Sequence, residues 1–203
     1  MWNEKEMLDY LHENLKESRL RHSLSVSETS VNLATIYGEN IEKAKIAGLV
    51  HDCVKNMTDE QLIKVAMEHE VQIDEIYTHN PSILHGLVGS IIARSIMGIY
   101  DEDILNAIRY HTTGRKNMSN LEKIIYIADY IEPLRKFRGV EELRSLSKVN
   151  LDAAIIQSLE NTIKYVISQK GLLHIDTIDA RNYLLCKQSG GKYEKPEKTK
   201  KDS

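Results

Sequence analysis

Cysteine, long apolar runs and N-terminal apolar residues are all scarce in this 203-residue chain, and each scarcity excludes a class of protein. Cys53 and Cys186 are too few and too far apart for a disulfide framework, so a reduced, cytoplasmic protein is expected. The longest apolar runs resemble "IIYIA" at residues 124–128, far short of the roughly 18 residues that span a bilayer. The opening "MWNEKEMLDY" carries acids, so no signal peptide is expected.

An excess of charge of either sign is also missing. The formal net charge is −3 and the pI is about 6.3, which gives no support for broad binding of nucleic acid. An anionic ligand would therefore have to be held by local groups instead of by a global field. A chain of this length fits one domain and can bury a real core without disulfides.

Only three prolines occur, and the apolar periodicity is helical almost throughout. Reciprocal capping patterns begin at Asn3, Thr58 and Ser119. Glycines follow several periodic segments, where helix C-termini place them. The sequence predicts an all-α fold with helices at 3–16, 18–37, 40–54, 58–70, 82–97, 101–111, 119–131, 141–147, 150–169 and 177–186.

We expect one helical domain over residues 1–186, with a core at about 18–135 and C-terminal helices at 141–186 packed on it. Residues 187–203 contain Gly-Gly, proline and several lysines but almost no apolar side chain. Such a segment cannot bury enough surface to offset its ordering entropy, so it is predicted to be a disordered basic tail.

Several polar side chains lie at apolar helical positions. They are His22, His51, Asp52, His85, His111 and Asp129. A buried carboxylate without partners is costly, so a shared explanation is needed. Imidazoles and carboxylates that converge in a helical interior suit a first-row divalent metal, and without a cysteine cluster a structural zinc site is not expected. The other four histidines lie in polar or boundary segments and need no special role.

The pair His51-Asp52 in "GLVHDCVKN" directly follows an apolar run. Adjacent helical residues diverge by about 100°, but at a helix end both can reach a cluster beyond it. Gly48 and the alanines before it would let another helix approach closely. An aspartate can also bridge two metal ions, the arrangement typical of phosphoester and phosphoanhydride cleavage.

The ordered set His22, His51-Asp52 and Asp129 resembles the H…HD…D signature of HD-domain metal-dependent phosphohydrolases. His85 and His111 look like the extra ligands of HD subgroups that hold two metals. The segments "RHSLSVSETSVNLA", "AKIAGLVHDCVKN", "LHGLVGSIIA", "AIRYHTTG" and "LEKIIYIADYIEPLRKFRGVEELR" resemble the YqeK family of symmetrical bis(5′-nucleosyl)-tetraphosphatases.

This resemblance implies a helical HD-domain bundle with its metal site in the helical interior. It also implies a hydrolase that cleaves diadenosine tetraphosphate into two ADP by metal-activated water, in the bacterial cytoplasm. One or two divalent transition-metal ions are implied, with iron expected and manganese, cobalt or nickel as alternatives. The expected partner is a small nucleotide, with no specific nucleic acid and no membrane, and a homodimer is one candidate assembly.

We hypothesise roles for the individual residues. His22, His51, Asp52 and Asp129 would bind the core metal, and His85 and His111 would complete a second site or meet phosphate oxygens. Asp52, His85 and His111 are the predicted catalytic residues. The predicted nucleotide or phosphate contacts are His22, Lys55, His85, His111, Thr112, Arg115, Asp129, Arg135, Arg138, Arg181 and Tyr183.

Three alternatives stay open at this point. The chain could be an HD phosphohydrolase for another nucleotide, such as a dNTP, a 5′-nucleotide or an alarmone. It could be a metal-containing module that binds a nucleotide without turnover. It could also be an RNA-associated factor that acts through its lysine-rich tail, which predicts salt-sensitive RNA binding.

Overall fold

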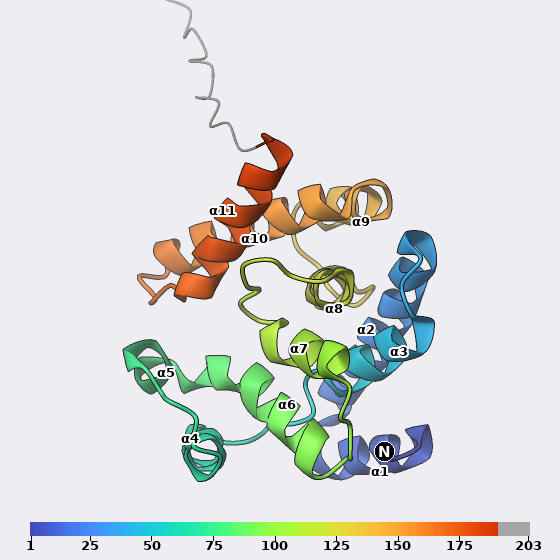
Figure 1. Cartoon of the computed structure of the whole chain (residues 1–203), viewed down its shortest axis with the longest axis vertical. Coiled ribbons are helices and arrows are strands. Elements are labelled where there is room, and N and C mark those ends of the chain that lie inside the picture. The colour runs from blue at the N-terminus through green and yellow to red at the C-terminus, as the bar shows by residue number, and fades with distance from the viewer. Residues whose placement is uncertain (191–203) are drawn as a thin grey trace, which may run out of the picture.

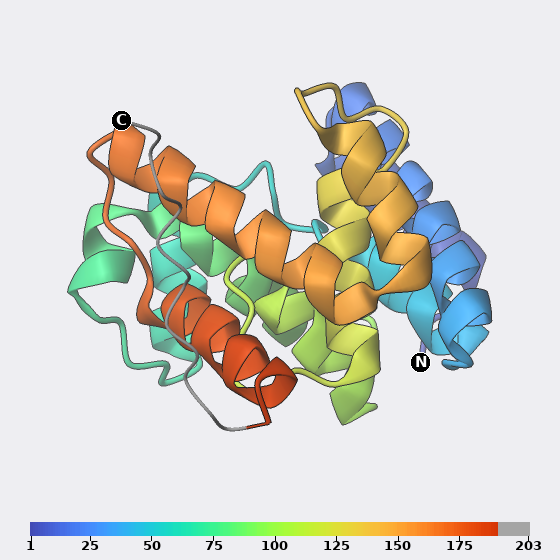
Figure 2. The same ribbon diagram turned by 90° about the horizontal axis from the view of Figure 1, so that it is seen from above.

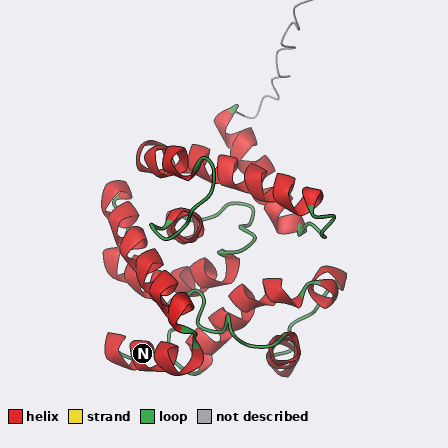
Figure 3. Cartoon of the chain, turned by 180° about the vertical axis from the view of Figure 1, so that it is seen from behind, coloured by secondary structure: helices red, strands yellow, loops and turns green. Residues whose placement is uncertain are grey.

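The computed structural model describes residues 1–190, and most of the predicted tail, residues 191–203, lies outside this range. The described residues form helices and loops without a strand (Figure 3), which confirms the all-α prediction. The elements are α1 (Glu4–Asn14), α2 (Glu17–Tyr37), α3 (Ile41–Val50), α4 (Asp59–Glu68), α5 (Glu75–His79), the 3-10 turn η1 (Pro81–Ile83), α6 (Leu84–Ser95), α7 (Glu102–Tyr110), α8 (Asn120–Ile131), α9 (Val140–Val149), α10 (Leu151–Ser168) and α11 (Ile175–Gln188).

The capping signals lie where the sequence predicts them. Asn3, Thr58 and Ser119 each accept a hydrogen bond from the backbone three residues later, in reciprocal capping boxes. Gly38 ends α2 in the left-handed conformation that glycine adopts without strain. These local hydrogen bonds explain why most predicted helices agree with the observed ones within a few residues.

Three observed helix limits differ from the predicted ones. The predicted helix at 40–54 ends at Val50, and a turn follows it. The five-residue helix α5 was not predicted, because it is too short to show a helical period. Helix α11 runs to Gln188, two residues into the segment predicted to be a tail.

Helix α8 lies at the centre of the molecule and is buried along most of its length. In Figure 1 it is seen nearly end-on, with α7 below it and α10 and α11 above it. Helix α2 packs against α3 and α8, and α7 packs against α3, α6 and α8. Helix α10 packs against α8, α9 and α11, and Figure 2 shows α10 and α11 side by side. None of the helices in residues 1–190 is long and apolar enough to cross a membrane.

Two glycines allow close helix contacts near the predicted ligands. A Cβ on Gly48 of α3 would lie 2.9 Å from the Ser27 Cα of α2, and a Cβ on Gly86 of α6 would lie 2.7 Å from the carbonyl oxygen of Arg109 on α7. Only glycine fits at such distances. The small residues therefore bring α3 onto α2 and α6 onto α7, next to His51 and His85.

Candidate metal centre

Six side chains from five helical segments meet in the interior of the described structure. His22 lies on α2, His51 caps the C-terminus of α3 with Asp52 in the following turn, His85 is the second residue of α6, His111 caps the C-terminus of α7, and Asp129 lies near the end of α8. We call these six residues the ligand cluster. Donor atoms of His22, His51 and Asp129 lie within 4.8 Å of one another, and so do those of His51, Asp52 and His111.

Asp52 occupies the middle of the ligand cluster and is 2% exposed. Its Oδ2 accepts a hydrogen bond of 2.9 Å from Arg19 Nη1 and lies 3.8 Å from His22 Nε2. Its Oδ1 lies 3.1 Å from His85 Nε2 and 3.5 Å from His111 Nε2. The two oxygens thus face different imidazoles, which is the geometry of a bridging carboxylate.

Asp129 completes the half of the cluster that contains His22. Its Oδ1 lies 3.0 Å from His22 Nε2 and 3.9 Å from His51 Nε2. The same oxygen accepts a hydrogen bond of 2.5 Å from Arg135 Nη2, and Arg135 Nε donates to the Asp129 backbone carbonyl at 2.8 Å. A guanidinium is therefore held directly at the cluster.

The four imidazoles are all oriented through Nδ1. His51, His85 and His111 place Nδ1 at 2.7, 2.5 and 2.7 Å from the carbonyl oxygens of Gly48, Ser82 and Ile108, three residues earlier in each case. His22 Nδ1 lies 3.0 Å from Glu132 Oε1. These oxygens can only accept, so Nδ1 carries the ring proton in each histidine. Each Nε2 therefore presents a lone pair to the cluster, as in histidines that bind metals.

Several of these buried donor atoms have no hydrogen-bond partner within residues 1–190. Among the described residues His22 Nε2, His51 Nε2 and Asp52 Oδ1 are buried without a well-formed hydrogen bond. His85 Nε2 and His111 Nε2 lie 3.0 Å apart, with both lone pairs turned inward. Buried acceptors that face one another are unfavourable unless a cation lies between them. The donor set therefore fits divalent metal ions.

Charge around the carboxylates keeps them ionised. Burial acts to raise the pKa of Asp129, but in the metal-free protein protonation of His22 and His51, together with the guanidinium of Arg135, outweighs it and holds the pKa well below its usual range. Burial also opposes ionisation of Asp52, and protonation of the surrounding imidazoles lowers its pKa well below the ordinary value. A metal ion would take the place of these protons at Nε2. Ionised carboxylates are the form that binds a metal.

Lys55 is an ammonium group in contact with the cluster, and its Nζ lies 3.0 Å from His85 Nε2. Burial is the main cause that lowers its pKa. The position agrees with the prediction that Lys55 lies near the site, at the end where His85 and His111 meet Asp52.

A cavity of about 460 Å³ opens beside the half of the cluster that contains His22. It is lined by Ser18, Arg19, Arg21, His22, Glu132, Leu134 and Arg135, and we call it the arginine cavity. Three guanidinium groups around one opening favour an anionic ligand, because arginine binds phosphate through two parallel hydrogen bonds.

The structure brings some predicted nucleotide contacts to the cluster and leaves others apart. Lys55 and Arg135 contact it, and Thr112 directly follows His111. The others have partners elsewhere or are exposed. Arg115 pairs with Glu122, Arg138 is exposed, Arg181 pairs with Glu160, and Tyr183 Oη donates to Asn117 Oδ1.

Sequence reasoning did not select Arg19 and Glu132, although both touch cluster residues. Arg19 precedes His22 by three residues and so shares its helical face, which was a usable signal. Glu132 follows Asp129 by three residues at the end of the same apolar helix. Its contact with His22 joins positions 110 residues apart, which no local pattern reveals.

Comparison with known proteins adds to this geometry. A family model described as "HD domain" matches residues 19–134, which include the whole ligand cluster. The symmetrical bis(5′-nucleosyl)-tetraphosphatase of Halalkalibacterium halodurans is 40% identical, over 92% of this chain and 99% of that protein. The enzyme of the same name from Bacillus subtilis is 39% identical, over 90% of this chain and 98% of that protein.

A solved structure agrees in fold. The crystal structure described as a predicted HD superfamily hydrolase involved in NAD metabolism from Clostridium acetobutylicum has a TM-score of 0.91 and is 52% identical. The match covers 92% of this chain and 99% of that one. The likeness therefore extends beyond the ligand cluster to α9, α10 and α11.

Proposed function

Because this chain belongs to the HD-domain family, and within it to the symmetrical bis(5′-nucleosyl)-tetraphosphatases, we propose that it hydrolyses diadenosine tetraphosphate to two ADP. The observation that carries the proposal is Asp52, whose two oxygens face two sets of imidazoles. Paired divalent sites joined by a carboxylate are typical of phosphoanhydride cleavage.

The proposed ligands divide around Asp52. His22, His51 and Asp129 would hold one divalent ion with Asp52, and His85 and His111 would share Asp52 around a second. When bound, such ions supply Lewis acidity at phosphate oxygens and lower the pKa of a coordinated water. We propose iron, with manganese, cobalt and nickel as alternatives, because imidazole and carboxylate ligands suit all four metals.

The chain's own cations have a separate role in this proposal. Arg19 and Arg135 donate to Asp52 and Asp129, and both line the arginine cavity. Phosphate oxygens of a bound nucleotide can accept the same hydrogen bonds, so we infer that both guanidiniums turn to the substrate. Lys55 would add a further donor at the His85 end of the cluster. ADP is a good leaving group, so a dedicated general acid is not required.

The domain organisation, the cellular location and the partner are part of the same proposal. We propose that residues 1–186 act as one catalytic domain and that the enzyme works in the bacterial cytoplasm, since the two tetraphosphatase relatives are bacterial. A small nucleotide is the proposed partner. A homodimer stays a prediction.

Product analysis tests the reaction. Chromatography of the products from diadenosine tetraphosphate should show ADP alone. AMP together with ATP would mean asymmetric cleavage and would contradict the proposal. A panel of dNTPs, 5′-nucleotides and alarmones separates the alternative HD activities. If one of those activities is the true one, its substrate should have a higher kcat/KM than diadenosine tetraphosphate.

The bridging position of Asp52 gives a second test. The Asp52→Asn variant should lose more than about 100-fold in kcat/KM, because an amide cannot bridge two cations and even indirect partners of a metal typically matter 10- to 100-fold. Asp9→Asn is the matched control, since Asp9 is exposed and pairs only with Lys5. Normal turnover by Asp52→Asn would contradict the bridging role of Asp52.

A further inference from the structure

A second cavity, of about 390 Å³, lies beside the cluster between three segments. They are η1, the loop after α7, and the end of α10 with the connection to α11. Its lining includes Ile83, Thr112, Thr162, Tyr165, Leu172 and His174, and we call it the threonine cavity. In Figure 1 the α10–α11 connection faces α5 in this region, and the rings of Tyr77 and His174 are 5.1 Å apart.

The threonine cavity adjoins the half of the cluster that lies opposite the arginine cavity. Thr112 directly follows His111, and Ile83 precedes His85 by two residues. His85 and His111 are the imidazoles that face Asp52 Oδ1, whereas the arginine cavity adjoins His22 on the Oδ2 side. A ligand that occupied both cavities would therefore lie near His111 and His85 at one end and against His22 at the other.

The chemistry of the two cavities differs. Among the described residues that line the threonine cavity, none is Lys, Arg, Asp or Glu. Its walls combine aliphatic side chains with threonine hydroxyls, and its volume falls in the lower part of the roughly 300–1,000 Å³ typical of small-molecule sites. Such a surface suits a neutral group with a flat apolar face and polar edges, unlike the phosphate-binding surface of the arginine cavity.

Two aromatic side chains in the threonine cavity favour a nucleobase. Tyr165 is 65% exposed at the rim of the cavity, so its ring is available for stacking. His174 is buried, whereas the sequence places it in a polar or boundary segment. Its Nδ1 accepts from the Asp176 backbone, so the neutral ring carries its proton on Nε2, which is buried without a partner among the described residues. Buried donors normally have an acceptor.

We propose that the threonine cavity binds one nucleoside of the dinucleotide, with the base stacked on Tyr165 and its polar edges turned toward the threonine hydroxyls of the cavity wall. This inference rests on the proposed function and adds to it a subsite for the base. The phosphates then run from Thr112 past Asp52 toward Arg19 and Arg135. Because the nucleoside is fixed at a set place, it decides which phosphate reaches the cluster, and so selects the central bond.

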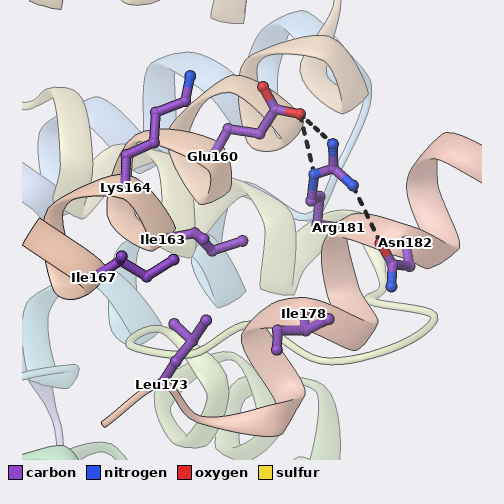
Figure 4. A pocket seen from close by; sticks show the side chains of 8 residues that line it. All are labelled: Glu160, Ile163, Lys164, Ile167, Leu173, Ile178, Arg181 and Asn182. Atoms are coloured by element: carbon purple, nitrogen blue, oxygen red, sulfur yellow. Dashed lines mark hydrogen bonds and ion pairs between the residues drawn. The ribbon is translucent and has the colours of Figure 1, made fainter. Parts of the chain in front are cut away.

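A third cavity provides the control. A hollow of about 500 Å³ on the α10–α11 pair is lined by Ile163, Lys164, Ile167 and Ile178 with the Glu160–Arg181 ion pair (Figure 4). It shares Leu173 with the threonine cavity but includes no cluster residue and none next to one in the sequence. A substitution there tests for general damage to the α10–α11 pair.

The experiment compares Tyr165→Ala, Tyr165→Phe and Lys164→Ala in the metal-loaded full-length enzyme. The KM for diadenosine tetraphosphate and the inhibition constant of ADP should rise about fivefold or more in Tyr165→Ala, the lower bound for loss of one base–aromatic stack. Inhibition by pyrophosphate, which has no base, should not change. Tyr165→Phe keeps the ring and should restore the ADP affinity that Tyr165→Ala loses. Lys164→Ala lies in the third cavity and should match the wild type.

Unchanged ADP inhibition in Tyr165→Ala would overturn the proposal, and so would an equal weakening of ADP and pyrophosphate. The proposed function can fail separately, if the wild type makes no ADP from diadenosine tetraphosphate. In that case, calorimetric titration of ADP into the metal-loaded proteins tests the nucleoside subsite independently of the proposed reaction. Weaker binding by Tyr165→Ala supports a nucleotide subsite, and equal binding by all variants refutes it.

Discussion

At the scale of single residues, one histidine of the ligand cluster is oriented differently from the other three. His51, His85 and His111 bond a backbone carbonyl three residues earlier, so their ring positions follow from the local backbone. His22 instead depends on the side chain of Glu132, at 3.0 Å. Glu132 is 1% exposed, and its other oxygen accepts from the Leu134 backbone at 2.6 Å.

The variant Glu132→Gln should therefore weaken metal binding without displacing a ligand. The neutral amide holds His22 less firmly and removes negative charge behind the ring, and loss of such a partner typically costs 10- to 100-fold in metal affinity. The measurement is the metal dissociation constant by competition with a chelating dye.

Glu122→Gln is the matched control for Glu132→Gln. Glu122 is also 1% exposed and also accepts one backbone N–H, from Ser119, and one side chain, Arg115. Both variants should lose stability, by about 1–3 kcal/mol for the buried donor left without its acceptor. Only Glu132→Gln should change the metal dissociation constant, and equal affinities in the two variants would refute a role for Glu132 in orienting His22.

The residues that could be chosen from the sequence share one property. Each predicted ligand stands as a polar group among apolar helical neighbours, which is visible without a structure, and the structure places all six together. Glu132 could not be chosen the same way, because its importance lies in a contact 110 residues away in the chain. Arg19 was indicated only by the helical face that it shares with His22, since its contact with Asp52 joins positions 33 residues apart. Arg181 and Arg115 pair with Glu160 and Glu122 and do not contact the cluster in the described structure, so their role as phosphate ligands stays a prediction.

At the scale of helices, the distance between α6 and α7 fixes the distance between two imidazoles. His85 lies in the first turn of α6 and His111 at the end of α7, and their Nε2 atoms are 3.0 Å apart. Gly86, next to His85, lets the α7 backbone approach so closely that a Cβ would lie 2.7 Å from the Arg109 carbonyl oxygen. The ligand geometry thus depends on a missing side chain.

The variant Gly86→Ala should push α6 from α7, separate His85 from His111 and lower metal occupancy. Overpacking of this kind costs about 1–3 kcal/mol. Gly89→Ala on the same helix is the control, because its Cβ would lie 3.4 Å from the nearest atoms, an ordinary contact. Metal content per chain and thermal melting should both fall for Gly86→Ala and stay near the wild type for Gly89→Ala. Equal behaviour of the two variants would contradict the argument.

The limits of a helix could be predicted where side chains cap it, and less well where tertiary contacts determine its end. Ser119 and Thr58 carry their own start signals, and the helices begin beside them. The end of α3 at Val50 has no local stop signal. The chain turns there because His51 and Asp52 must both face the cluster, which is a tertiary requirement.

At the scale of the whole molecule, the ligand cluster joins segments from His22 on α2 to Asp129 on α8. Five helical segments converge on a few ångströms of space, with acceptors that repel one another when no cation is bound. Binding of ions to the folded state alone must therefore stabilise the fold by mass action.

Removal of metal should lower the melting temperature. Ligand at 100 times its dissociation constant contributes about 2.7 kcal/mol, and a chain of this size shifts by about 2–4 °C per kcal/mol, so chelation should lower Tm by about 5–10 °C. Calorimetry with and without a chelator measures the shift. Asp52→Asn, which should not retain its metals, is the control and should melt at one temperature in both conditions. A wild type indifferent to chelator would refute the metal centre.

The charges around the cluster imply an order of events. Among the described residues at the cluster, the negative charges of Asp52, Asp129 and Glu132 stand against the positive charges of Arg19, Arg135 and Lys55. Arg21 adds one positive charge in the arginine cavity. The fixed charge of the bare protein is therefore small compared with that of a tetraphosphate. Each divalent ion that binds would add two positive charges, and so would strengthen the attraction for a tetraphosphate, which carries roughly four negative charges. We therefore expect metal loading to precede nucleotide binding, so that the enzyme recruits its substrate only once it is equipped to cleave it.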